Sequence, residues 1–144
     1  MRLSILSALA ILSTAVFAHP TAEANHLQAR TNGWAIKNFT RSSTGPNAPV
    51  AYTFIIDTYG TFSNCTIVDS TNPAWYHAWY DLPCKDAPFH VSWGWDYPGD
   101  FTVMTVESFP ASGPRQKVYF GYEHPNSGLP GTVYYPDKGY NTPQ

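Results

Sequence analysis

Histidine is the residue type in this sequence best suited to chemistry, because its imidazole can bind a metal or carry a proton near neutral pH. If the chain is cleaved after Ala18, His19 becomes the amino terminus and offers an amine and an imidazole to one copper ion. A second histidine would complete such a site, and the candidates are His77, His90 and His124. The sequence after His19 is polar, which argues against this copper enzyme because the site needs a rigidly held terminus.

A small secreted nuclease is a second catalytic hypothesis. Such chemistry needs a general base, a general acid and a cation for the phosphate, and the available residues are Glu107, Glu123, His124 and Arg115. Glu123 and His124 are adjacent, so on a strand their side chains point to opposite faces. The nuclease and the copper enzyme therefore rank behind the other interpretations.

No established catalytic pattern is found elsewhere in the sequence. Asp96 and Asp100 flank a Tyr-Pro-Gly turn, where acidic residues are commonly turn formers. The chain has no G-x-S-x-G elbow, no phosphate-binding loop and no zinc-binding helix pattern. We therefore expect a protein that is not an enzyme and that uses no metal or cofactor.

Aromatic side chains are the stronger candidates for function, and one group lies in the segment PAWYHAWYDLPC. Its four large rings are Trp75, Tyr76, Trp79 and Tyr80, and their spacing fits neither a strand nor a helix longer than one or two turns. Binding residues concentrate on surface loops, so we predict that these four rings form the binding surface. The alternative is a loop that folds over one end of the core with its rings tucked in.

A second aromatic group lies in residues 89–97, FHVSWGWDY. Its large apolar residues occupy every second position, which places them on one face of a strand. Such a face could stack on sugars, but burial of each aromatic ring removes about 150–250 Å² from water. We predict that Phe89, Val91 and Trp93 belong to the core, and that Trp95 and Tyr97 lie near the rim beside the following turn.

The two cysteines, Cys65 and Cys84, predict a disulfide bond if the protein is secreted. The bond would close a ring of about 20 residues and stabilise the fold by about 3 kcal/mol; two buried free thiols are the alternative. Two sequons, at Asn38 and Asn64, are candidate glycosylation sites. The second sequon contains Cys65, so glycan addition there would compete with formation of the disulfide.

The two ends of the chain differ in character from its middle. An apolar run behind Arg2 ends in AVFA and predicts a signal peptide over residues 1–18, which is too short to span a membrane. We expect a flexible leader over residues 19–32, a β domain over 33–136 and a loose tail over 137–144. After cleavage, 7 Lys and Arg remain against 10 Asp and Glu. This weak negative charge argues against binding to nucleic acid or to an anionic membrane.

Seven short runs rich in aromatic and β-branched residues are separated by Pro, Gly, Asn and Ser, which predicts strands joined by turns. The expected strands are residues 34–40, 50–58, 62–69, 89–95, 100–108, 117–123 and 131–135. The expected fold is all-β, a single small β-sandwich or β-barrel of about seven short antiparallel strands. Its predicted core is Trp34, Ile36, Tyr52, Phe54, Ile56, Phe89, Val91, Trp93, Val103, Phe120 and Tyr122.

The segment GWAIKNFTR, residues 33–41, contains the pattern Trp-x-Ile-x-Asn-Phe-x-Arg. A YTFII strand, a cysteine on each side of a loop, an aromatic strand and an FTVMTV strand follow it. Over about residues 33–123 this arrangement resembles the Alternaria major-allergen-like family of small secreted ascomycete proteins. The resemblance implies a secreted, disulfide-linked all-β fold that is associated with host interaction or allergenicity and has no established catalytic mechanism.

We therefore predict a secreted, non-enzymatic fungal protein that acts outside the cell as an effector-like or cell-surface interaction protein. Its expected partner is an extracellular host protein or a cell-wall polysaccharide, rather than nucleic acid or a membrane. The main alternative is a carbohydrate-binding module that uses exposed Trp and Tyr rings.

Overall fold

The structure is a computed structural model that describes residues 33–96 and 98–144, except for the side chain of Tyr140. The predicted signal peptide, the predicted leader with His19, and the predicted rim position of Tyr97 lie outside the described residues. Within the described part of the chain, no helix is long and apolar enough to cross a membrane.

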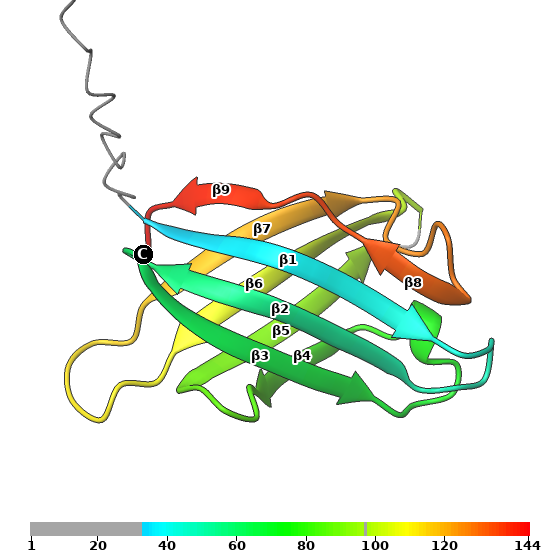
Figure 1. Ribbon diagram of the computed structural model, residues 1–144, viewed down its shortest axis with the longest axis horizontal. Helices are drawn as coiled ribbons and strands as arrows, with labels where there is room; N and C mark the ends of the chain where they lie inside the picture. Colours follow the sequence, from blue (N-terminus) through cyan, green and yellow to red (C-terminus); the bar gives the residue numbers. More distant parts are fainter. Residues whose placement is uncertain (1–32, 97) are drawn as a thin grey trace, which may run out of the picture.

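The described residues form nine strands and one turn of 3-10 helix (Figure 1). The elements are β1 (Trp34–Ser43), β2 (Val50–Thr58), β3 (Thr61–Asp69), η1 (Ala74–Tyr76), β4 (Trp79–Pro83), β5 (Phe89–Asp96), β6 (Phe101–Ser108), β7 (Lys117–Glu123), β8 (Gly131–Tyr134) and β9 (Lys138–Asn141). The first sheet has the order β3-β2-β1-β8, and β9 pairs with β1 beyond the end of β8. The second sheet has the order β4-β5-β6-β7, and every strand pair in both sheets is antiparallel.

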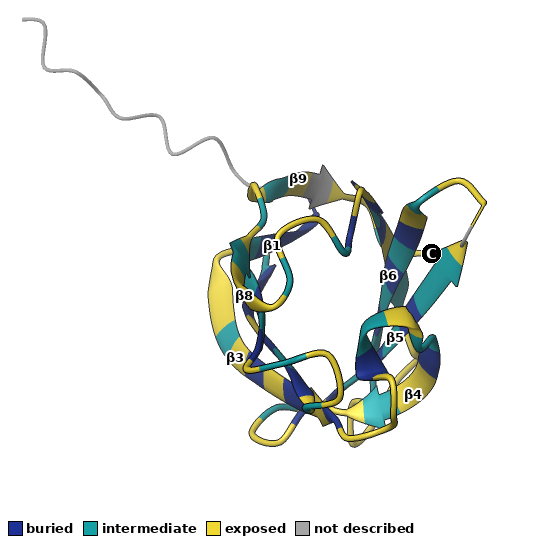
Figure 2. Ribbon diagram, turned by 90° about the vertical axis from the view of Figure 1, so that its right-hand side faces the viewer, coloured by how far each residue is buried: buried dark blue, intermediate teal, exposed yellow. Residues whose placement is uncertain are grey.

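The two sheets pack around one core, as the end-on view of Figure 2 shows, and this confirms the all-β prediction. Alternation places Tyr52, Phe54 and Ile56 of β2 in the core, and Phe89, Val91 and Trp93 of β5 face them from the second sheet. The Trp93 ring is 1% exposed and meets the rings of Phe39 and Tyr52, with centroids 5.7 and 5.4 Å away. The centre of the segment FHVSWGWDY is therefore core.

Val103 is the one predicted core residue that is wrong. It is only half-buried and lies on the outer face of β6, whereas Met104 and Val106 are fully buried. The strand carries apolar residues at both odd and even positions, so its sequence does not show which of its two faces points into the core. Pairing of Met104 with Trp93 of β5 decides the question, because directly paired residues share a face.

A β-bulge in β1 controls which of its residues face the core. The pairing with β2 shifts between Lys37 and Thr40, and Asn38 takes a left-handed conformation with φ of 52°. Asn tolerates this region better than most residues because its short side chain can hydrogen-bond locally. Before the bulge the even-numbered residues point inward, and after it Phe39, Arg41 and Ser43 do so. The strand also continues three residues past its predicted end at Thr40, so Arg41 lies inside the sandwich.

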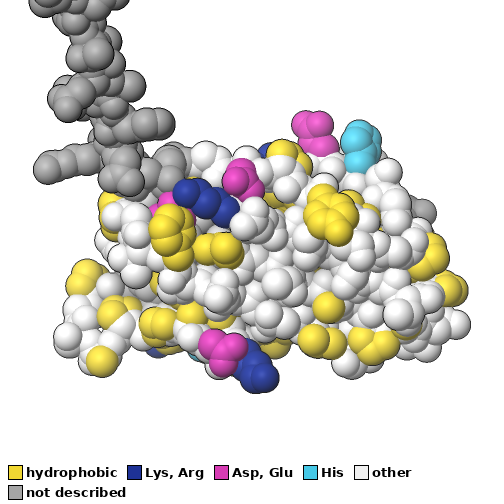
Figure 3. Space-filling model, in the orientation of Figure 1, with side chains coloured by type: hydrophobic (Ala, Val, Ile, Leu, Met, Phe, Trp, Pro, Cys, Tyr) yellow, Lys and Arg dark blue, Asp and Glu magenta, His cyan; other side chains and the backbone are white. Residues whose placement is uncertain are grey.

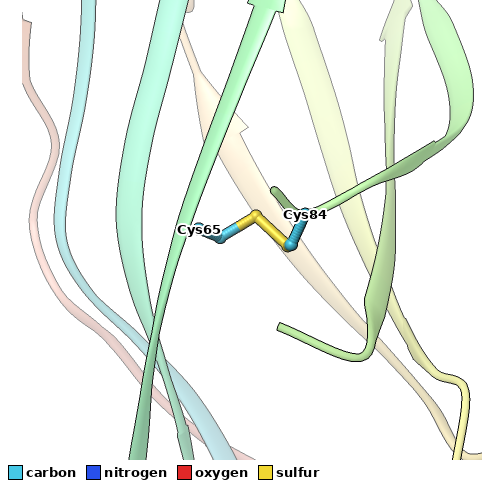
Figure 4. The surroundings of a disulfide bond; sticks show 2 residues. All are labelled: Cys65 and Cys84. Carbon is cyan, nitrogen blue, oxygen red and sulfur yellow. A yellow bond between two sulfur atoms is a disulfide. The ribbon is translucent and has the colours of Figure 1, made fainter. Parts of the chain in front are cut away.

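The two open sides of the sandwich are closed differently. On one side the predicted disulfide is present, and it joins Cys65 of β3 to Cys84 just after β4 (Figure 4). On the other side Lys117 of β7 and Gln144 exchange two backbone hydrogen bonds of 2.9 and 3.1 Å. The predicted loose tail over residues 137–144 is therefore wrong, because it contains β9 and bridges the free edges of β1 and β7.

Candidate functional site

Arg41 is the most unusual polar residue of the core, because its side chain is 0% exposed. Its guanidinium carbon lies 4.9 Å from the ring centroid of Tyr52 and 5.0 Å from that of Trp93. Aromatic faces attract cations, and the attraction grows when water is excluded. The planar guanidinium also suits this position between two rings better than a lysine ammonium does.

Neutral oxygen atoms surround the buried charge of Arg41. Nη1 donates to the carbonyl oxygen of Pro125, to Oδ1 of Asn126 at 3.1 Å and to the hydroxyl of Tyr135 at 3.3 Å. Nη2 donates to the hydroxyl of Tyr52 at 3.2 Å and to the carbonyl oxygen of Trp75 at 3.5 Å. Among the described residues no carboxylate forms an ion pair with Arg41. Oriented dipoles therefore stabilise the charge.

The hydrogen bonds of Arg41 tie together segments that are far apart in the sequence. Trp75 belongs to η1, and Pro125 and Asn126 belong to the loop between β7 and β8. Both segments lie at the end of the sandwich that faces the reader in Figure 2. The buried cation thus fixes the positions of two loops at one end of the fold.

An open groove lies at this end, and we call it the rim groove. It has a volume of about 510 Å³, and it is lined by Tyr76, Trp95, Pro98, Asp100, His124, Asn126 and Ser127. The rings of Tyr76 and Trp95 stack with centroids 5.2 Å apart and planes 30° apart. Asp100 Oδ2 and His124 Nδ1, which also line the groove, are 2.9 Å apart. The rim groove thus combines stacked rings with several hydrogen-bonding groups.

The four predicted binding residues separate in the structure. Tyr76 is 51% exposed in the rim groove, and Tyr80 is 67% exposed on the outer face of β4 beside Gly94. Trp75 is half-buried against the core. Trp79 is 4% exposed and starts β4 with its ring against Tyr52. Tyr76 is the one member of the set that lines the rim groove.

The groove residues that the binding prediction missed come from the end of β5 and from the turns that follow β5 and β7. The period-two pattern placed Trp95 near an edge, and it does lie half-buried at the rim. Asn126 and His124 lie in a segment, HPNSG, that reads as an ordinary turn. Their contribution depends on the fold that brings this turn next to η1, so the local sequence carries no sign of it.

The histidines proposed as copper ligands are each paired with a different aspartate. His77 Nδ1 contacts Asp69 and His90 Nδ1 contacts Asp81, both at 2.9 Å, and His124 pairs with Asp100. Within residues 33–96 and 98–144, no three His, Cys, Asp or Glu side chains are grouped as metal ligands. The structure thus does not bring the three candidates together, and His19 lies outside its described part.

The residues proposed for nuclease chemistry lie at opposite ends of one strand pair. Glu107 forms ion pairs with Lys117 at 3.1 Å and with Arg115 at 3.8 Å. Glu123 pairs with Phe101 at the other end of the ladder between β6 and β7. At about 3.4 Å per residue, the six-residue separation amounts to about 20 Å. The acid, base and cation of that hypothesis are therefore not assembled.

Both sequon asparagines, Asn38 and Asn64, are exposed. Asn64 and Thr66 lie on the outer face of β3, with Cys65 pointing into the core between them. The backbone NH of Asn38 donates to Asp137 Oδ1 at 2.8 Å. Glycosylation at these two residues remains a prediction.

Two buried tyrosines, Tyr52 and Tyr122, and the half-buried Tyr135 resist ionisation. Burial raises the pKa of all three hydroxyls above the ordinary value of 10.0. The positive charge of Arg41 opposes this rise in the pKa of Tyr52 and of Tyr135. The Tyr122 hydroxyl is buried and has no hydrogen-bond partner among the described residues. Because the unfolded chain releases these protons first, stability is lost as the pH rises above about 10.

We expect Tyr122→Phe to raise the free energy of unfolding by about 1 kcal/mol at pH 7, because it removes a buried hydroxyl that has no partner. The fall in stability above pH 10 should also become less steep, since one of three protons no longer contributes about 1.4 kcal/mol per pH unit. Urea unfolding between pH 7 and pH 11 measures both effects. The exposed Tyr80→Phe variant is the control and should change stability at pH 7 by less than about 0.5 kcal/mol. A loss of stability in Tyr122→Phe at pH 7 would contradict this account.

The structural features define a class: a small all-β protein with one disulfide and an open groove at one end. Comparison with known families matches residues 35–144 to the family described as Effector TSP1. The match covers most of the chain, so this protein belongs to the Effector TSP1 family. It supports the effector-like part of the sequence prediction without assigning the Alternaria major-allergen-like family. Neither the curated proteins nor the solved structures contain a significant match to the chain.

Proposed function

We propose that this protein is a secreted fungal effector that acts outside the cell by binding rather than by catalysis. Membership of the Effector TSP1 family over residues 35–144 is the observation that carries the proposal. The disulfide between Cys65 and Cys84 supports it, because such bonds persist mainly in oxidising compartments. The signal peptide predicted over residues 1–18 and the resemblance of the opening strand to the Alternaria major-allergen-like family point the same way.

The distribution of charged groups supports binding over catalysis. The three histidines of the described chain pair with separate aspartates, and both terminal nitrogens of the Arg41 guanidinium, Nη1 and Nη2, donate inside the protein. Lys and Arg are scattered rather than clustered on the face drawn in Figure 3. Such a surface does not favour the phosphates of nucleic acids. The expected partner is thus an extracellular host protein or a cell-wall polysaccharide.

Deletion and complementation in the producing fungus test this proposal. We expect deletion of the gene to alter colonisation of the host while growth in culture stays unchanged. The full chain should restore colonisation and appear in the culture medium. A Leu9→Arg variant, which interrupts the apolar run of the signal peptide, should be retained in the cell and should not restore colonisation. Unaltered colonisation after deletion, or full rescue by the retained variant, would contradict the proposal.

A further inference from the structure

The stacked rings of the rim groove offer an aromatic surface at the end of the sandwich. Tyr76 is 51% exposed, and its ring packs at 5.2 Å against that of Trp95. Ligand sites typically combine such aromatic surfaces with a few placed polar groups. The C–H faces of a sugar ring are apolar and flat enough to pack on an aromatic ring. The rings alone, however, would fit many apolar ligands equally well.

The polar groups of the rim groove narrow the choice of ligand. Asn126 Oδ1 accepts a hydrogen bond from buried Arg41 at 3.1 Å, so the two amide hydrogens of Asn126 remain to donate. The Asp100 carboxylate uses Oδ2 with His124 Nδ1, which leaves Oδ1 to accept and His124 Nε2 to exchange a hydrogen bond. The groove thus presents both donors and acceptors beside the rings. Sugar hydroxyls, which donate and accept, complement such a mixture.

The charge and the polar groups of the rim groove argue against anionic ligands and against wholly apolar ligands. Its lining contains one carboxylate and no Lys or Arg, and the nearby Arg41 is fully buried by the protein itself. An anionic ligand would therefore meet a carboxylate and no accessible cation. A wholly apolar ligand would strip water from Asn126, Asp100 and His124 without replacing its hydrogen bonds, which is costly. A neutral molecule rich in hydroxyl groups avoids both penalties.

We infer that the rim groove binds a neutral glycan chain, with Tyr76, supported by the ring of Trp95, packing on a sugar ring and Asn126, Asp100 and His124 binding its hydroxyls. The groove is open to solvent, so the ends of a longer chain can extend beyond it. Arg41 acts as a positioning residue, because its bonds to the Trp75 and Pro125 carbonyl oxygens hold both walls in place before a ligand arrives. This inference rests on the proposed function, because it names the ligand class of an extracellular binding protein.

Calorimetric titration of the purified secreted protein with two neutral probes, laminarin and chitohexaose, tests the inference. We expect at least one probe to bind, and Tyr76→Ala and Trp95→Ala each to weaken its affinity about tenfold or more. The control is Tyr80→Ala, which removes an equally large exposed ring outside the groove and should leave affinity unchanged. Binding of neither probe would overturn the inference. Full affinity in Tyr76→Ala, or loss of affinity in Tyr80→Ala, would overturn the assigned site.

An Asn126→Asp variant separates binding from folding. It keeps the shape of the side chain and the contact with Arg41, but it replaces the amide donors with a carboxylate oxygen. We expect weaker glycan binding together with an unchanged or higher melting temperature, because the new carboxylate pairs with the buried cation. Full glycan affinity in this variant would overturn the role assigned to Asn126. If neither probe binds while the colonisation experiment succeeds, the glycan site fails and the proposed effector function stands.

Discussion

Replacing Arg41 by methionine is expected to lower the free energy of unfolding by about 3 kcal/mol. Methionine fills much of the same space, so the loss does not come mainly from a cavity. It comes from the hydroxyl of Tyr52 and the carbonyl oxygen of Trp75, which lose the donor that Arg41 supplies. The carbonyl oxygen of Pro125 keeps a hydrogen bond from the hydroxyl of Tyr135. Urea unfolding followed by tryptophan fluorescence measures the change, since Trp93 lies against the guanidinium.

Two further variants make the Arg41 prediction specific. Arg41→Lys keeps the positive charge, but its single ammonium group cannot donate to all five oxygen atoms that Nη1 and Nη2 contact, so we expect it to recover only part of the lost stability. Arg115→Met removes the same side chain from a site where it is 61% exposed, and its effect should stay within about 0.5 kcal/mol. Equal stability of Arg41→Met and Arg115→Met would show that the buried guanidinium does not organise the fold.

The sequence could predict the parts of the fold in which local pattern and tertiary packing agree. Strict alternation in β2 and β5 identified Tyr52 and Trp93 as core residues, and the secretory context paired Cys65 with Cys84. Strands such as β6 carry apolar residues at both parities, so their inward face depends on register with a neighbour. That dependence explains the error at Val103.

The sequence could not predict the surroundings of Arg41. A regular strand from Trp34 onward would place even-numbered residues inward, and Arg41 would then face solvent. The bulge at Asn38 reverses this parity, and no local pattern distinguishes a bulge from an ordinary strand residue there. Because Arg41 orders η1 and the loop that contains Asn126, the rim groove could not be predicted from the sequence either.

The tail escaped prediction for a related reason. β9 contains Lys138 and Gly139 and has no apolar alternation, so its sequence is typical of a loose end. Its order comes from partners, since the free edges of β1 and β7 offer backbone groups that need hydrogen bonds. A short polar segment can therefore complete a sandwich that longer strands leave open.

The disulfide and the C-terminal segment close opposite sides of the sandwich, so removing each one should weaken a different pair of strands. Replacing both Cys65 and Cys84 by alanine is expected to lower the free energy of unfolding by about 3 kcal/mol, because the unfolded chain is no longer constrained. Backbone amides of β3 and β4 should then exchange hydrogen faster, since these edge strands lose the bond that joins them. The central pairs β1–β2 and β5–β6 should lose protection only by the fall in global stability, so the additional loss should be confined to β3 and β4.

Removal of residues 142–144 is the matched control, because it cuts the hydrogen bonds between Gln144 and Lys117 on the opposite side. Faster exchange should then appear in β7 and β9 and leave β3 and β4 unchanged. Hydrogen exchange followed by mass spectrometry compares the two variants directly. Uniform loss of protection in the alanine variant would show that the disulfide stabilises the whole sandwich instead of one edge. If the losses stay local, the covalent bond and the terminal strand close opposite edges independently, and the central strands supply the stability that remains.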